Sequence, residues 1–209
     1  MDLIWLLPAV SAVIDWYAVA RGDRRTETWA KPATLVGLVL TAVVLGAAGT
    51  SAGLWLLLGL LLGLAGDVLL LDDSDTRFRL GLAAFLLGHL AFVVSFTRLG
   101  LDPPHWQWVA WVVLFGCLVT TRQVVPATFL RGGQALALPV AFYTVVIGAM
   151  VILAFDTGKP LIATGAAVFA VSDSILALDR FVRPRPWAPV AVMVTYHLGQ
   201  ALIVAGVLA

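Results

Sequence analysis

Residues 63–71 read Gly-Leu-Ala-Gly-Asp-Val-Leu-Leu-Leu, which places the carboxylate of Asp67 inside an otherwise apolar segment. An ionised Asp near the middle of a membrane helix costs roughly 2.5 to 3.5 kcal/mol on insertion scales, so such a residue usually faces a polar cavity. A second carboxylate, Asp173, has a similar setting in residues 171–176, Val-Ser-Asp-Ser-Ile-Leu. We therefore expect the two acidic side chains to mark a functional site between membrane helices.

The composition of the chain excludes a water-soluble domain. Of its 209 residues, 61% are hydrophobic and 12% are charged, which is too apolar for a soluble domain of this length. We expect one all-α transmembrane domain over residues 1–209. No basic tail or stripe in the sequence indicates a nucleic-acid partner. Cys117 is the single cysteine, so no intrachain disulfide can form.

Eight apolar segments are long enough to cross the roughly 30 Å hydrocarbon core of a bilayer. They are residues 3–20, 32–48, 54–71, 80–97, 106–121, 134–155, 161–178 and 187–208. The connecting loops differ strongly in charge, because the thirteen cations all lie in the odd-numbered loops except Arg98 and Lys159. The positive-inside rule then places the odd-numbered loops in the cytoplasm and both termini outside, as in a protein of the bacterial inner membrane.

A weak internal repeat relates the two halves of the chain. Residues 65–70 and 171–176 both carry aspartate at their third position, and each stretch precedes a basic loop and a helix with a histidine, His89 or His197. Because four spans separate the two stretches, the halves would share one orientation in a 4+4 parallel arrangement. Two short matches also arise by chance, so both explanations stay open.

Further polar side chains lie at depths comparable to those of Asp67 and Asp173 on this topology. They are Asp15, His89, Tyr143, Tyr196 and Gln200. A cavity open to the cytoplasm would collect them, and Tyr196 and Gln200, four residues apart, share one helix face. Each could instead be a bonded core residue, and Asp15 lies close enough to the interface to be solvated.

A metal site is an alternative, because two carboxylates and two histidines can ligate zinc or iron. The chain has no closely spaced ligand motif such as His-Glu-x-x-His. It also has no Gly-x-Ser-x-Gly nucleophile elbow. The sequence therefore indicates neither a known metal-ligand motif nor a serine nucleophile, and we expect no metal and no other cofactor.

Six short motifs follow one another over nearly the whole chain. They are Lys31-Pro32, Gly66-Asp67, Gly81-x-x-Ala84-Phe85-x-x-Gly88-His89, Tyr143 with Met150, Ser172-Asp173, and Tyr196-x-x-x-Gln200-x-Leu202-Ile203. Their order and spacing resemble the YhhN family of integral-membrane lysoplasmalogenases, which hydrolyse alkenyl ethers. His197 lies outside this pattern.

The resemblance implies hydrolysis of the vinyl ether bond of a lysoplasmalogen, a 1-alkenyl-glycerophospho-ethanolamine or -choline, to a fatty aldehyde and a glycerophospho-alcohol. This reaction needs a proton donor for the β-carbon of the enol ether and an anion that stabilises the oxocarbenium ion and orients water. Asp67 and Asp173 are the candidate acid/base pair, and Lys31 is expected at the cytoplasmic mouth, where it would meet a lipid phosphate. The expected orienting groups are His89, Tyr143, Tyr196, Gln200 and Asp15.

Two other functions fit the same buried polar residues. A small proton-coupled transporter would use buried Asp and His side chains as a proton relay, and a lipid-binding membrane protein would do no chemistry. The expected partners are a lysolipid substrate and the membrane lipids, and the sequence predicts no oligomeric state. Many bacteria contain no plasmalogens, so another ether lysolipid is an alternative substrate.

Overall fold

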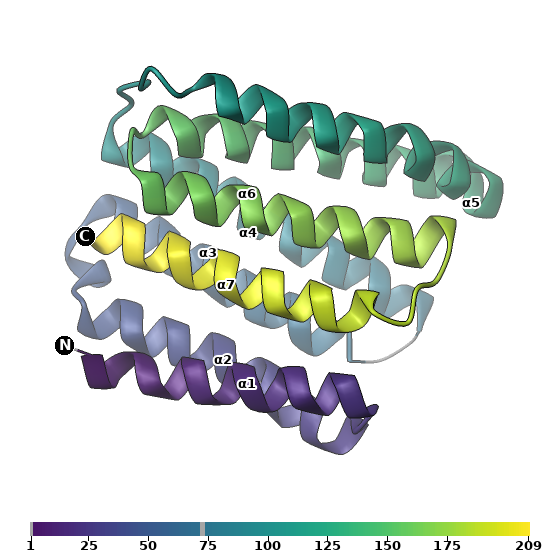
Figure 1. Cartoon of the computed structure of the whole chain (residues 1–209), viewed down its shortest axis with the longest axis horizontal. Helices are drawn as coiled ribbons and strands as arrows, with labels where there is room; N and C mark the ends of the chain where they lie inside the picture. Colours follow the sequence, from purple (N-terminus) through teal and green to yellow (C-terminus); the bar gives the residue numbers. More distant parts are fainter. Residues whose placement is uncertain (1, 72–73) are drawn as a thin grey trace.

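The computed structural model describes residues 2–71 and 74–209, which form helices packed side by side (Figure 1). Within these residues there is no β-strand. The α-helices are α1 (Leu6–Arg21), α2 (Arg24–Val44), α3 (Ser51–Leu69), α4 (Asp75–Leu99), α5 (Trp108–Asp156), α6 (Pro160–Ala177) and α7 (Ala188–Leu208). Short 3-10 helices, Asp2–Trp5 and Ala47–Gly49, precede α1 and α3, and a π-helical turn, Leu178–Val182, extends α6.

The helices have the length and surface of membrane-spanning elements. In the described part of the chain, six of them are long and apolar enough to cross a bilayer. The exception is α2, which is less apolar because charged residues occupy its first turns. Large apolar side chains such as Phe115, Leu130 and Leu138 are exposed on the outside of the bundle, where a bilayer would cover them. The protein is therefore an all-helical integral membrane protein.

Helix α5 is interrupted at its centre. As one straight helix its 49 residues would measure roughly 74 Å, more than twice the hydrocarbon thickness of a bilayer. Gly132 and Gly133 depart from helical geometry, and Gly133 has a φ of 58°, which glycine adopts without steric cost. The chain turns back at these glycines, so a first limb (residues 108–131) and a second limb (residues 134–156) run side by side (Figure 1). The loop expected at residues 122–133 is therefore helical up to this bend.

The two ends of the bundle differ in what they contain. Both termini lie at one end, and the α1–α2 turn, the α5 bend and the α6–α7 loop lie at the other (Figure 1). Arg21, Arg131 and Arg183 belong to those three connections or directly flank them. The cations of these three connections thus lie at the end opposite the termini, which we call the basic end.

The start of α2 differs from the expected boundary at residue 32. The helix begins at Arg24, because the Asp23 side chain accepts a hydrogen bond from the backbone N–H of Thr26 at 3.2 Å and caps the helix. Lys31 consequently lies inside α2 and is only 5% exposed. The prediction that Lys31 belongs to the first loop is therefore wrong.

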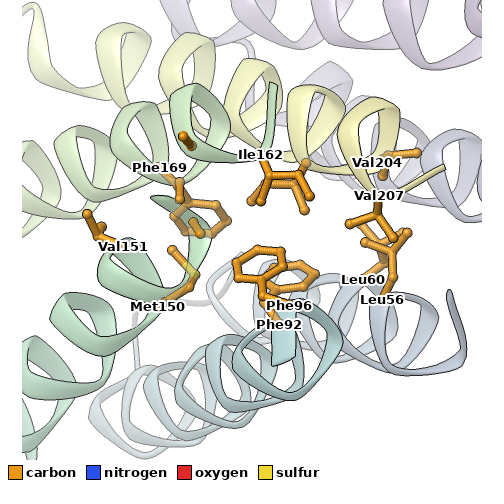
Figure 2. Close-up of a cluster of buried hydrophobic side chains, with 14 of the residues drawn as sticks. Leu56, Leu60, Phe92, Phe96, Met150, Val151, Ile162, Phe169, Val204 and Val207 are labelled. Carbon is orange, nitrogen blue, oxygen red and sulfur yellow. The ribbon is translucent and has the colours of Figure 1, made fainter. Parts of the chain in front are cut away.

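The core lies between α3–α4 and α6–α7, the two helix pairs that pack most extensively. Figure 2 shows Phe92 and Phe96 of α4 in the middle of this apolar cluster, with their rings stacked at a centroid distance of 6.3 Å. In the α6–α7 pair, a Cβ added to Gly165 would lie 2.9 Å from the carbonyl oxygen of Gly199. Small residues thus allow the close backbone approach that holds the helices around the site.

Candidate active site

A cavity of about 250 Å³ lies among the helices near the basic end. Its lining contains Asp67 and Asp173, and with them the predicted site residues Lys31, Tyr143 and Tyr196. His89 and Gln200 are buried beside these groups, whereas Asp15 is buried in α1. The structure therefore brings most of the predicted polar residues of α2 to α7 together around one cavity.

Asp67 lies in the last turn of α3 and is 1% exposed. Its Oδ1 lies 3.4 Å from Nζ of Lys31 in α2, and its Oδ2 accepts a hydrogen bond of 2.9 Å from the Tyr196 hydroxyl in α7. Gly63, one turn earlier in α3, makes room for this arrangement, because a Cβ there would lie 3.3 Å from both the Tyr196 hydroxyl and the Gln200 amide nitrogen. A buried carboxyl group needs such partners, and the Lys31 amino group and the Tyr196 hydroxyl supply them to Asp67.

Asp173 of α6 has a different set of partners. Its Oδ2 accepts a hydrogen bond of 2.9 Å from the Tyr143 hydroxyl of the second limb of α5. The same oxygen lies 3.4 Å from Nε2 of His89 in α4. The side chain of Asp173 is 13% exposed, so it is the more accessible carboxyl of the two.

The tautomer of His89 follows from its second contact. Its Nδ1 lies 2.6 Å from the backbone carbonyl oxygen of Phe85. A carbonyl only accepts hydrogen bonds, so Nδ1 carries a hydrogen and Nε2 faces the carboxyl of Asp173. Nε2 of His89 and Oδ2 of Asp173 therefore face each other across 3.4 Å.

Two aromatic rings that the sequence did not mark as functional connect these groups. Phe169, one turn before Asp173, has its ring centroid 4.7 Å from His89 and 5.3 Å from Tyr196, both in edge-on contacts. Phe85 packs edge-on against Tyr196 at 5.8 Å. The sequence signals are the place of Phe85 in the motif that ends at His89, and the spacing of Phe169 and Phe85 four residues before Asp173 and His89. An aromatic residue at that spacing is usual in any helical core.

Asp15 of α1 and His197 of α7 do not line the cavity. Asp15 is fully buried, so the alternative that it is solvated is wrong, and neither carboxylate oxygen has a hydrogen-bond partner among the described residues. His197 accepts a hydrogen bond of 3.1 Å at Nδ1 from the indole N–H of Trp16. His197 therefore bonds to a packing residue of α1 and to neither carboxyl of the cavity.

Over residues 2–71 and 74–209, no three His, Cys, Asp or Glu side chains come close enough to share a metal ion.

Arg180, from the π-helical turn after α6, also lines the cavity. Arg180 is the exposed one of the two cations in the lining, and Lys31 is the buried one. From the sequence, Lys31 was expected at the mouth of the cavity. The sequence marked Arg180 only as one of the cytoplasmic cations.

Comparison with known proteins places this site in a family. The family model described as YhhN family matches residues 26–207. Proteins named "Lysoplasmalogenase" from Mycobacterium tuberculosis and Mycobacterium bovis are each 34% identical over 155 residues, which is 73% of this chain and 59% of each relative. The human "Lysoplasmalogenase TMEM86B" is 26% identical over 201 residues, 95% of this chain and 84% of that protein.

The chain thus aligns with about 59% of the length of the mycobacterial relatives. No solved structure matches it. The family match extends over most of the chain and includes every residue that lines the cavity. The chain therefore belongs to the YhhN family.

Proposed function

We propose that the protein hydrolyses the vinyl ether bond of a lysoplasmalogen, giving a fatty aldehyde and a glycerophospho-alcohol. The observation that carries this proposal is that Asp67 and Asp173 line one buried cavity but have different partners, a lysine and a histidine. Two carboxyl groups in different surroundings can serve as acid and as anion in one reaction. The names of the mycobacterial and mammalian relatives support the choice of substrate.

In the first step, the Asp173–His89 pair donates its shared proton to the β-carbon of the vinyl ether. The π electrons of the double bond form the new C–H bond, and the positive charge moves to an oxocarbenium ion. The Tyr143 hydroxyl, which donates to Asp173, holds the carboxyl group in place and stabilises it as the proton leaves.

In the second step, the Asp67 carboxylate stabilises the oxocarbenium ion and accepts a proton from the attacking water, so that a hemiacetal forms. Collapse of the hemiacetal transfers that proton to the departing glycerol oxygen and returns the hydroxyl proton to the Asp173–His89 pair. Atoms and charges balance over the cycle, since one water is consumed and both carboxyl groups regain their starting states.

We also propose that the chain is one domain with eight crossings, both termini outside and the basic end in the cytoplasm. The two limbs of α5 supply the fifth and sixth crossings, and the cations at the basic end support this orientation. The contacts of the site also support a 4+4 repeat. Asp67 contacts Lys31 of the second crossing and Tyr196 of the eighth. Asp173 contacts Tyr143 of the sixth crossing and His89 of the fourth, which are the equivalent crossings of the other half.

The test is incubation of the purified protein with a lysoplasmenylethanolamine, with separate measurement of aldehyde and glycerophosphoethanolamine. Release of the two products in equal amounts supports the proposal. Solute flux in liposomes without lipid products would instead select a transporter. Recovery of the intact lysolipid after long incubation, with no flux, would select a lipid-binding protein.

A further inference from the structure

A second pocket, of about 310 Å³, adjoins the catalytic cavity at the basic end. Arginines from three elements line it: Arg79 of α4, Arg131 of the first limb of α5, and Arg180 of the π-helical turn. Arg180, with the rings of Phe78 and Phe181, lines both this pocket and the catalytic cavity. A ligand that occupies one of the two spaces can therefore extend into the other.

Contacts with neighbouring groups hold the guanidinium groups of Arg131 and Arg180 in place. Arg131 Nη1 donates a hydrogen bond of 2.8 Å to the backbone carbonyl of Arg180, and the guanidinium of Arg180 lies 4.7 Å from the centroid of the Phe78 ring. Among the described residues, no acidic side chain lines the pocket and no carboxylate pairs with any of the three arginines. Clustered guanidinium groups of this kind match the geometry of a phosphate.

The distance from the reacting carboxyl to this pocket suits one class of ligand. Arg180 follows Asp173 by seven residues, and both line the catalytic cavity, separated by about 10 Å along the helix axis. In a single-chain vinyl ether phospholipid, seven bonds separate the β-carbon from phosphorus, which is roughly 8 to 9 Å at ordinary bond lengths. A lipid with its β-carbon at Asp173 therefore carries its phosphate to the position of Arg180.

We propose that the pocket formed by Arg79, Arg131 and Arg180 binds the phosphodiester of a single-chain ether lysolipid. This inference rests on the proposed function, which it deepens by assigning the head-group site. Lys31, which was expected to meet the phosphate, is buried and paired with Asp67. The pocket arginines select for the phosphate, whereas the Lys31–Asp67 pair acts at the ether bond.

The test measures equilibrium binding, because binding does not depend on turnover. The probes are a saturated 1-O-alkyl-glycerophosphoethanolamine and the matching 1-O-alkylglycerol, which lacks the phosphate. The variants are the single change Arg79→Gln and the double change Arg131→Gln with Arg180→Gln. The control is Arg183→Gln, because Arg183 is exposed and lines neither space. We expect each pocket arginine to contribute about tenfold to binding of the phospholipid, with alkylglycerol binding unchanged and Arg183→Gln like wild type.

Three outcomes would overturn the head-group site. In the first, the pocket variants bind both probes as wild type does, or lose both equally. In the second, inorganic phosphate alone displaces the lysolipid at the same concentration as the lysolipid itself, which would make this a site for free phosphate. In the third, a two-chain phospholipid competes equally well, which would make it a site for bilayer lipid.

The two proposals fail separately. Selective loss of phospholipid binding in the arginine variants, together with no aldehyde release by wild type, would support the head-group site and contradict the hydrolase activity. Equal KM values for 1-alkenylglycerol and the matching phospholipid, with aldehyde released from both, would support the hydrolase activity and contradict the head-group site. Thermal unfolding of each variant verifies that its fold is intact.

Discussion

The Nε2 atom of His89 lies 3.4 Å from the Oδ2 atom of Asp173. Because Nδ1 of the same ring faces a backbone carbonyl, the His89–Asp173 contact can hold a single proton between its two members. The other carboxyl of the cavity, Asp67, is paired with Lys31 instead. One carboxyl thus faces an imidazole ring and the other an amino group, and this difference underlies the division of labour proposed for the reaction.

Removing either tyrosine hydroxyl should slow the reaction without unfolding the protein. Tyr143→Phe and Tyr196→Phe each delete one hydrogen bond of 2.9 Å to a carboxyl oxygen. Hydrogen bonds to charged groups contribute enough that we expect kcat to fall roughly ten- to hundredfold in each variant. The matched control is Tyr17→Phe, since Tyr17 is exposed on α1. Wild-type kcat in both cavity variants would contradict the assigned roles.

The buried ion pair predicts a double-mutant result. Lys31→Met leaves the Asp67 carboxylate buried without its cation, and loss of one partner of a buried pair costs about 3 to 5 kcal/mol. Adding Asp67→Asn removes the unpaired charge, so the double variant should recover most of the lost thermal stability while staying inactive. Equal stability of the Lys31→Met variant and wild type would show that the two groups are not coupled.

The close approach of α6 and α7 predicts which glycine is needed for packing. A Cβ at Gly165 would lie 2.9 Å from backbone atoms of Gly199 and Ile203, which cannot move aside as a flexible side chain can. Gly165→Ala should therefore destabilise the protein by roughly 1 to 3 kcal/mol, as overpacked cores do. Gly116→Ala is the control, because nothing lies within 4 Å of its added Cβ. Equal unfolding temperatures in the two variants would disprove the packing argument.

The proposed orientation can be tested by thiol labelling of the two ends of the bundle. On a background in which Cys117 is replaced by Ala, cysteine is introduced at Gly49, between α2 and α3, or at Arg183, after the π-helical turn. A membrane-impermeant maleimide added to intact spheroplasts should label the cysteine at position 49 and spare the one at 183. Labelling at position 183 but not at position 49 would show the opposite orientation in the membrane.

The sequence was sufficient to nominate the two carboxyls and the polar residues around them, but not which of these residues contacts which carboxyl. Asp67 and Asp173 stand out because charge is rare in apolar helices, and in the structure both line one cavity. Lys31 was misplaced because a cation near a span end was assigned to a loop. The Asp23 cap, which moves the start of α2 to Arg24, was overlooked.

The aromatic residues and arginines of the site could not be identified by residue type alone. Phe169 contacts both His89 and Tyr196, but a phenylalanine in a membrane helix is usual for packing. Arg131 and Arg180 are 49 residues apart in the chain and meet only because α5 folds back at Gly132 and Gly133. Positive-inside counting treats such arginines as equivalent, whereas the fold distinguishes two that share a pocket from Arg183, which lines none.

The most direct test of the proposed mechanism is the rate of aldehyde release from lysoplasmenylethanolamine by Asp67→Asn and Asp173→Asn. Asp102→Asn, in the exposed α4–α5 loop, is the control. General acid/base groups contribute about a hundredfold or more, so both cavity variants should fall at least that far below wild type and the Asp102 control should match it. Wild-type aldehyde release by both Asp67→Asn and Asp173→Asn would contradict the account.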